Sequence, residues 1–228
     1  MQIYEAFNGD GVSVVVTDTD LDHAARDSGP LTTELANAAA QARRADLIDN
    51  LRRSLDGDDR ARKLAAAKAL LALNDRPSGE LLRSLSATDT DPVVAKSFIA
   101  IATRLRGPQA VFDLFVDPAT DPQLARLLVS NYNSHLRPES GDIRFLVAAL
   151  QHYLDRSLPW LTTLRPEIWD NGVYLMLDAL SNESAVRQLR EADEQRSTLR
   201  RLLAELTEYT DDDDVLAEAH DLRAALSD

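Results

Sequence analysis

Histidine is the residue of this chain best suited to bind a transition metal or to move a proton near neutral pH. The 228-residue sequence has no cysteine and four histidines, at positions His23, His135, His152 and His220. A helical zinc site needs two ligands three or four residues apart, and no two of these histidines have that spacing. The sequence therefore does not predict a zinc centre, a thiolate metal site or a cysteine nucleophile.

An acidic run near the N-terminus matches the first ligands of a calcium-binding loop. The segment 18–22 has aspartate at every second position, but the sixth position of the loop is His23 instead of glycine and the twelfth is Gly29 instead of glutamate. A solvated acidic turn is the better interpretation. A second acidic run, 211–214, precedes the last predicted helix, where negative charge interacts favourably with the helix dipole. We expect a capping role there rather than a metal site.

The sequence also lacks the common motifs of nucleotide hydrolysis and of serine hydrolases. Its segment 9–11, Gly-Asp-Gly, lies between two predicted strands, and no glycine is followed by lysine and then serine or threonine. No serine has the Gly-x-Ser-x-Gly surroundings of a hydrolase nucleophile. We therefore expect no catalytic residue, no bound metal and no cofactor.

Composition indicates a soluble protein whose partners are not anionic. The chain carries 38 acidic and 25 basic residues, a formal net charge of −13, and its hydrophobic content of 44% is enough for a sizeable core. This charge disfavours nucleic acids and anionic membranes as partners and favours a protein with a basic surface. No stretch approaches the ~20 apolar residues that span a bilayer, and residues 1–5 do not resemble a signal peptide. The expected location is the cytoplasm.

The first thirty residues have the pattern of a β-hairpin. Ile3–Phe7 and Val12–Thr17 are rich in β-branched and aromatic residues, and Asn8–Gly11 between them suits a tight turn. An isolated hairpin is marginally stable in water, so this one must pack on helices, pair with another strand, or offer an edge to a partner. We favour packing against the first helix. The alternative is a homo-oligomer in which two hairpins pair across a two-fold axis.

From residue 31 onward, the spacing of apolar residues predicts only helices. The first is a long amphipathic helix that starts at Thr32 or Thr33 and ends near Asp56. Further helices are expected at about 59–74, 78–87, 91–106, 108–116, 121–136 and 141–155, then short or irregular ones near Pro159 and Pro166, a long one over 183–209 and a last one over 213–226. Proline near the start of several segments suits the first turn of a helix.

Three of these segments are versions of one helix, repeated about every thirty residues. They run from Asp59 to Leu73, from Asp91 to Leu105 and from Asp121 to Leu136. A shorter apolar segment precedes the second and the third. This is the pattern of stacked helix pairs, which specifies a scaffold with a long surface rather than a reaction.

The repeat resembles the HEAT-repeat superfamily, in particular its short bacterial, bilin-lyase type. The match is carried by Asp91-Pro92-Val93-Val94-Ala95-Lys96 with Leu105, and by Asp121-Pro122-Gln123-Leu124-Ala125-Arg126 with Leu136. The resemblance covers about 58–150 and implies an all-α, HEAT-like solenoid of antiparallel helix pairs. It divides the chain into a hairpin with its linker, 1–30, and a repeat domain, 31–228, in which 156–228 is an atypical C-terminal cap.

In that family the second helix of each pair lines the concave face. The positions that the resemblance implies to be exposed there are Arg83, Ser84, Gln109, Asp113, Arg144 and Gln151. From these we take four candidate partner-binding residues, Arg83, Asp113, Arg144 and Gln151. Trp160 and Trp169 are two further candidates, because tryptophan is a common interface anchor, although core packing is favoured for them.

A polar segment also interrupts the apolar stripe of the helix predicted over 121–136. Asn131, Tyr132 and His135 continue the stripe defined by Leu124 and Leu128, so polar groups are expected near a buried face. The asparagine could bond the backbone of a partner. We favour an internal hydrogen bond, because buried amides normally find partners within the fold.

These features together predict a non-enzymatic scaffold or regulator that binds a partner protein through the solenoid surface. An immunity or inhibitor protein that masks a basic partner is one specific form. The alternative is a HEAT-like enzyme of the DNA glycosylase or lyase type. A glycosylase needs a basic groove, and the residues that could provide one are Arg43, Arg44, Arg52, Arg53, Arg60 and Arg62.

Overall fold

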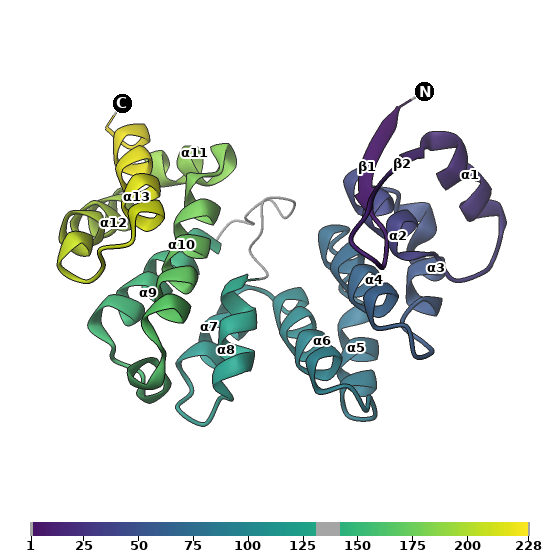
Figure 1. Cartoon of the computed structure of the whole chain (residues 1–228), viewed down its shortest axis with the longest axis horizontal. Coiled ribbons are helices and arrows are strands. Elements are labelled where there is room, and N and C mark those ends of the chain that lie inside the picture. The colour runs from purple at the N-terminus through teal and green to yellow at the C-terminus, as the bar shows by residue number, and fades with distance from the viewer. Residues whose placement is uncertain (1, 131–141, 228) are drawn as a thin grey trace. The chain divides into compact units, whose positions relative to one another are not determined.

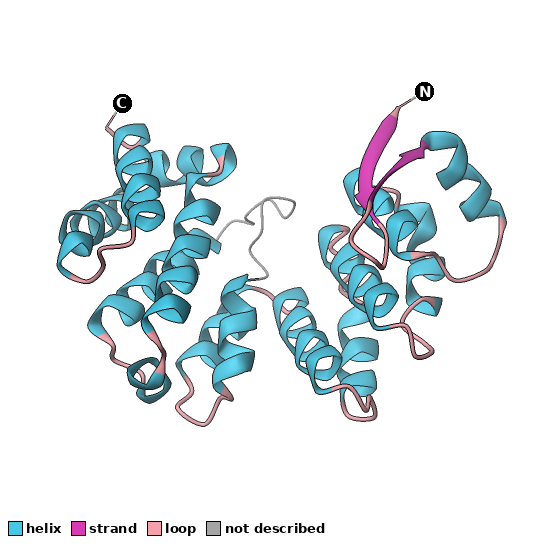
Figure 2. Ribbon diagram, viewed as in Figure 1, coloured by secondary structure: helices cyan, strands magenta, loops and turns pink. Residues whose placement is uncertain are grey.

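The computed structural model describes residues 2–130 and 142–227. Within them the chain forms thirteen α-helices, three short 3-10 helices and one two-stranded antiparallel sheet (Figures 1 and 2). The predicted helical class with an N-terminal hairpin is therefore confirmed. The chain divides into two compact units, Met1–Arg106 and Gly107–Asp228, and the hairpin belongs to the first. This division differs from the one predicted at residue 30.

The hairpin consists of β1 (Ile3–Phe7) and β2 (Ser13–Thr17), paired in antiparallel register with Glu5 opposite Val15. Its turn is held by the side chain of Asn8, whose Oδ1 accepts hydrogen bonds from the backbone N–H groups of Asp10 and Val12 at 3.0 and 2.9 Å. Gly11 adopts a φ of 76°, which glycine tolerates without strain. The predicted hairpin and its turn are confirmed.

Helix α1 (Asp18–Arg26) occupies the segment that was predicted to be a solvated acidic turn. That assignment is wrong because the last strand residue, Thr17, is also a helix N-cap. Its hydroxyl accepts from the N–H of Asp20, and the carboxylate of Asp20 accepts from the N–H of Thr17, which together form a capping box. Asp18 and Asp20 therefore lie in the first turn of a helix, where the helix dipole favours them.

The long helix predicted from Thr33 to Asp56 is also wrong. The structure has α2 (Thr33–Gln41), a 3-10 turn η1 (Ala45–Leu47) and α3 (Ile48–Arg53). The helix ends because Arg43 adopts a left-handed φ of 52°. The apolar spacing continues across this break, since Leu47, Leu51 and Leu55 are all buried on the far side of the turn.

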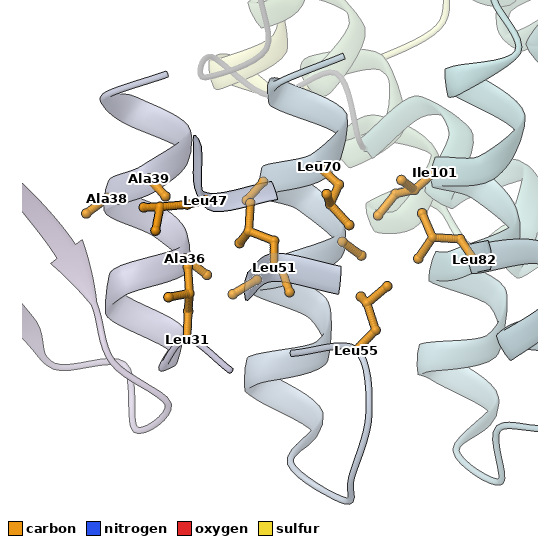
Figure 3. Packing of buried hydrophobic residues seen from close by; sticks show 14 of the residues in the cluster. Leu31, Ala36, Ala38, Ala39, Leu47, Leu51, Leu55, Leu70, Leu82 and Ile101 are labelled. Carbon is orange, nitrogen blue, oxygen red and sulfur yellow. The ribbon is translucent and has the colours of Figure 1, made fainter. Parts of the chain in front are cut away.

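The remaining helices of the first unit are α4 (Arg60–Ala72), α5 (Ser78–Ser86) and α6 (Pro92–Leu105), close to their predicted bounds. Helix α4 packs against α2, α3 and α6, and α5 packs against α6. Small side chains on α2 and α4 allow close approach of these helices, and larger ones fill the remaining space. Figure 3 shows members of this core, among them Ala36, Ala39, Leu51, Leu70 and Ile101.

The second unit contains α7 (Pro108–Val116), α8 (Pro122–Ser130), α9 (Asp142–Asp155), the 3-10 helix η2 (Pro159–Thr163), α10 (Pro166–Ser181), α11 (Glu183–Glu191), α12 (Asp193–Glu205), the 3-10 helix η3 (Leu206–Glu208) and α13 (Asp213–Ala225). Helix α10 packs against α8, α9, α11 and α13. It is a regular helix of 16 residues, where short or irregular helices were expected. The long helix predicted over 183–209 is divided at Ala192, whose ψ of 80° is not helical.

The aspartates that begin the three repeated segments have one local role. Asp59, Asp91 and Asp121 each accept hydrogen bonds from backbone N–H groups at the start of α4, α6 and α8. Such N-caps satisfy N–H groups that the helix itself leaves unpaired. The repeat of the sequence is thus a repeat of helix starts.

Candidate interaction surface

The inner face of the hairpin is fixed to the helices of the first unit. Ala6 and Val16 are buried, and both strands contact α2. The hydroxyl of Tyr4 donates to Asp18 at 3.0 Å, and the backbone N–H of Gln2 donates to the same carboxylate at 2.8 Å. These two bonds, led by the one from Gln2, hold the pKa of Asp18 below its usual value. The hairpin is therefore anchored at the start of α1.

The outer face of the hairpin carries apolar side chains that no described residue covers. We use "outer face" for the side of the sheet that carries Ile3, Phe7 and Val15, which are 60–62% exposed. Val12, next to the turn, is 57% exposed as well. Large exposed hydrophobic residues are otherwise rare in the described chain, where the others are Leu81 and Tyr209 at 37% and 38%. Apolar side chains gathered in this way are typical of an interaction site.

The hydrogen-bond pattern of the hairpin shows which backbone groups point away from it. The N–H of Asn8 donates to Val12, and the N–H of Asp18 donates to Gln2. Both bonds join even-numbered residues. In the same register, the hydrogen-bonded pairs between them are Tyr4 with Val16 and Ala6 with Val14. Because hydrogen-bonded and non-hydrogen-bonded pairs alternate in an antiparallel ladder, the odd-numbered residues turn their N–H and C=O groups outward, to the two edges of the sheet.

Helix α2 covers the β1 edge. The side-chain amide of Gln41 donates to the carbonyl of Glu5 at 2.8 Å, and that of Asn37 donates to the carbonyl of Phe7 at 3.1 Å. The outward carbonyls of β1 are therefore occupied by the protein's own side chains, and the helix stands where a further strand would have to lie.

The β2 edge, formed by the outward backbone groups of Ser13 and Val15, is open. No hydrogen bond joins these groups to another described residue. A cleft of about 550 Å³ lies beside Val15 and is lined by β2, α1, the segment after α1 and the start of α2. We call it the β2 cleft; its lining includes Val14, Val15, Val16, Asp20, His23, Ala24, Asp27, Gly29, Pro30, Leu31, Glu34 and Leu35.

The segment between α1 and α2, which lines the β2 cleft, is held by the buried side-chain amide of Asn50. Asn50 on α3 donates through Nδ2 to the carbonyls of Asp27 and Gly29 at 2.6 and 2.9 Å. The hydroxyl of Ser54 accepts from the N–H of Leu31 at 2.7 Å, and it is fully buried. Polar bonds in such a position rigidify the chain they hold. The wall of the cleft is thus well defined.

The four polar candidates from the sequence lie outside this surface. Arg83 on α5, Asp113 on α7 and Arg144 on α9 are exposed, and Gln151 on α9 is partly buried. Arg83 pairs with Glu80 at 2.8 Å, and Asp113 accepts from Gln109 at 2.8 Å.

The two tryptophans are buried in the second unit. Trp160 and Trp169 are 5% and 2% exposed, and they surround Tyr153 with ring centroids 5.8 and 6.5 Å away. The indole N–H of Trp169 donates to the carbonyl of Tyr153 at 3.0 Å. This burial agrees with core packing and leaves neither residue available as a surface anchor, so these two candidates are corrected. Their desolvated surroundings also raise the pKa of Tyr153.

The described histidines are in unrelated surroundings. His23 lines the β2 cleft, His220 is exposed beside Asp221, and His152 contacts Ser157 at 2.6 Å, with its pKa lowered by burial. Over residues 2–130 and 142–227, no three histidine or acidic side chains are placed to hold a metal. In the same residues no helix is long and apolar enough to cross a membrane. His135 and the polar segment 131–135 lie outside the described residues.

Five of the six arginines considered for a basic groove, all except Arg53, form hydrogen bonds or ion pairs within the first unit. Arg44 forms ion pairs with Asp46 at 2.7 Å and with Asp22 at 2.9 Å. Arg52 pairs with the buried carboxylate of Asp75 at 2.8 Å. Paired arginines present less positive charge to a phosphate backbone than free ones do.

Sequence reasoning missed the outer face, although a signal for it was present. A two-stranded sheet packed on helices can bury only one of its faces. In β1, apolar residues occupy both faces, since Ile3 and Phe7 alternate with Tyr4 and Ala6. Two apolar faces in one strand indicate a second contact. No comparable signal identifies Asn37 and Gln41 as the residues that cover one edge.

Comparison with known proteins found no relative of this chain. No family model matches the chain, and no curated protein or solved structure matches it. The geometry of the hairpin and of the β2 cleft is therefore what supports a function for this chain.

Proposed function

We propose that this protein is a non-enzymatic interaction module, a scaffold or regulator that binds a partner protein through the hairpin of its first unit. The observation that carries the proposal is the exposure of Ile3, Phe7 and Val15 together on the outer face. Burying apolar surface contributes about 25 cal/mol per Å², so such a face gains free energy when a partner covers it. The anchored inner face presents it in a fixed orientation.

Charge supports a partner with a basic surface. Residues 1–42, which include the hairpin, α1 and α2, contain seven acidic residues and one arginine. Residues 43–106 contain nine acidic and thirteen basic residues, so the acidity of the first unit is concentrated around the hairpin. An acidic region around an apolar centre steers a basic partner and opposes an acidic one. An inhibitor that masks a basic partner is one form of this function.

The HEAT-like architecture belongs to the same proposal. The packing of the first unit supports it. Helix α4 packs against both α2 and α6, and along the chain α3 links α2 to α4 and α5 links α4 to α6. Asp59 and Asp91 act as N-caps in the same way at the starts of α4 and α6. Stacked helix pairs of this kind offer a rigid support for a binding element.

Site-specific crosslinking tests the proposal directly. A photoreactive phenylalanine analogue is introduced at Phe7 on the outer face and, as the matched control, at Leu81, an exposed apolar residue of α5 in the same unit. In a lysate of the native host, we expect one protein to be crosslinked from position 7 and not from position 81. The double variant Phe7→Thr, Val15→Thr, which places a residue of high β-propensity at both positions, should lose that protein while its melting temperature stays unchanged.

Two results would contradict this function. Equal crosslinking from positions 7 and 81 would show that the outer face has no special affinity. Retention of the same protein by the double variant would place the binding surface elsewhere, with Arg83 as the first residue to examine in this unit.

A further inference from the structure

We infer that the β2 edge is a strand-addition site, where an extended, positively charged segment of a partner protein pairs with β2 and lies along the β2 cleft. This inference rests on the proposed function and specifies how the partner is held. In this mode the backbone gives affinity, and pockets for alternate side chains give specificity.

The backbone geometry of β2 is the first support. Ser13 and Val15 turn their N–H and C=O groups away from β1, and no described residue accepts or donates there. An antiparallel strand placed at this edge would pair one residue with Ser13 and the next but one with Val15, and each pair would exchange two hydrogen bonds. Thr17 ends the available edge, because its N–H already donates to Asp20 at 2.8 Å.

The difference between the two edges is the second support. The side chains of Gln41 and Asn37 cover the β1 edge at 2.8 and 3.1 Å. Proteins usually block exposed edges with charges, proline, bulges or covering elements. Here one edge is covered by a helix, whereas the other has a cleft of about 550 Å³ beside it. The open edge and the cleft beside it form one site.

The lining of the β2 cleft defines the side chains that fit. Carboxylates of Asp20, Asp27 and Glu34 line it, together with the apolar residues Leu31 and Leu35. Successive residues of a strand point to opposite faces of the sheet. Residues of the added strand that pair with Ser13 and Val15 would lie on the outer face, where apolar side chains would extend the exposed apolar surface of the hairpin. The residues between them point into the cleft, where lysine or arginine would meet the carboxylates.

Charge argues against a second copy of this chain as the occupant. Two β2 edges could pair across a two-fold axis, as considered for the hairpin from the sequence. That arrangement would bring the acidic residues 1–42 of both copies together, with seven acidic residues and one arginine in each. Juxtaposed like charges are unfavourable at an interface. A cationic segment from another protein is the occupant that the charges favour.

The test uses the full-length chain and a synthetic probe, a capped, fluorescent heptapeptide in which valine and arginine alternate. We expect saturable binding by fluorescence anisotropy, weakened by salt because the attraction is partly between exposed charges. In NMR hydrogen exchange, the amides of Ser13 and Val15 should become protected when the peptide binds. A peptide of the same pattern with glutamate in place of arginine should not bind.

Modified peptides separate strand addition from simple charge attraction without altering the protein. Methylation of the valine amides removes the donors that face β2 in an antiparallel pair, and it should abolish binding. Methylation of the arginine amides, which face solvent in that pair, should change affinity less than threefold. Equal effects of the two modifications, or no binding of the unmodified peptide, would overturn the inference.

Protein variants give an independent readout. Val15→Pro removes the outward N–H of the β2 edge and leaves the β1–β2 ladder intact, so binding should fall at least tenfold. Glu5→Pro makes the same change at the covered β1 edge and should leave binding unchanged. Asp27→Asn with Glu34→Gln should weaken binding about three- to tenfold at low salt. Melting curves establish that each variant is folded, and the peptide series decides the question if Val15→Pro is not.

Other outcomes are distinguishable from failure of the proposed function. Concentration-dependent dimerisation of the chain, abolished by Val15→Pro, would assign the edge to a second copy and overturn this inference. Crosslinking from Phe7 but not Leu81, combined with no protection of Val15 by any cationic peptide, would leave the outer-face function standing and remove strand addition. Failure of both experiments would remove both.

Discussion

At the scale of single residues, two amide side chains determine which edge of the hairpin remains open. Gln41 and Asn37 satisfy carbonyls of β1, and the corresponding groups of β2 have no such cover. Neither residue stands out in the sequence, where both lie in an alanine-rich helix with ordinary polar spacing. Their role arises only when the hairpin folds back onto α2, more than twenty residues away in sequence.

Lys63 and Asp89 form a largely buried ion pair in the first unit. Their side chains are 13% and 6% exposed, and the ammonium lies 2.7 Å from the carboxylate. Asp89 also accepts from the N–H of Asp91 at 2.9 Å, at the start of α6. The bond from Lys63 is the main reason that the pKa of Asp89 lies below its usual value.

This pair predicts a loss of stability in acid. A carboxyl group with a lowered pKa in the folded state stabilises the protein above its unfolded pKa of about 3.9, and that contribution disappears as the pH falls through the folded value. Asp89→Asn should destabilise the protein by about 1–3 kcal/mol at pH 7, because it removes a hydrogen bond between charged groups. Urea denaturation at pH 7 and pH 3 should show a smaller difference between variant and wild type at pH 3. The exposed Asp58→Asn is the control, and an equal difference at both pH values would contradict the prediction.

At the scale of elements, helix breaks are what the sequence could not locate. The apolar spacing runs without interruption from Leu35 to Leu55, yet the helix ends near Arg43, and the segment after Glu183 is likewise divided at Ala192. Neither break has glycine or proline, the residues that normally mark one. Burial of Leu47 and Leu51 against the neighbouring helices outweighs the local preference for a continuous helix. Where glycine or proline was present, as at Gly107 and Pro108, the predicted bounds agreed with the structure.

Two helical glycines give opposite predictions for the same substitution. In α10, a Cβ added to Gly172 would lie 2.6–2.9 Å from two ring carbons and the hydroxyl oxygen of the buried Tyr153, so Gly172→Ala should destabilise the protein by about 1–3 kcal/mol. In α5, a Cβ added to Gly79 would make ordinary contacts at 3.6 Å, so Gly79→Ala should be neutral or stabilising by up to about 1 kcal/mol. Thermal and urea unfolding of both variants measures these effects. Destabilisation of equal size in both would contradict the close approach at Gly172.

At the scale of the whole molecule, each of the two units has its own core. The core of the first contains the alanine-rich contacts of α2 and α4, and that of the second contains the aromatic residues around Tyr153. The first unit, 106 residues long, is within the ordinary size of an independently folding domain. The outer face and the β2 cleft lie entirely within it.

The independence of the first unit is testable by truncation. We expect a protein ending at Arg106 to be helical by circular dichroism and to unfold in one cooperative transition, because its core residues come from that unit alone. In this fragment, as we expect for the full chain, the amide of Val15 should become protected from hydrogen exchange when the cationic peptide binds. A matched protein ending at Ala87, which lacks α6, is the control and should not fold cooperatively, since α6 packs on α4 and α5. A non-cooperative melt of the longer fragment would contradict the division into units.

The sequence by itself determined the hairpin, the helical class, most helix starts and the acidic charge. These follow from local chemistry: the turn of Asn8–Gly11, the caps at Asp59, Asp91 and Asp121, and the composition depend on residues close together in the chain. Tertiary structure alone decided that Trp160 and Trp169 are core residues, that one edge of the hairpin is covered, and that a cleft lies beside the other. Burial and edge cover depend on segments distant in sequence, and a local pattern carries no information about which distant surface will meet it.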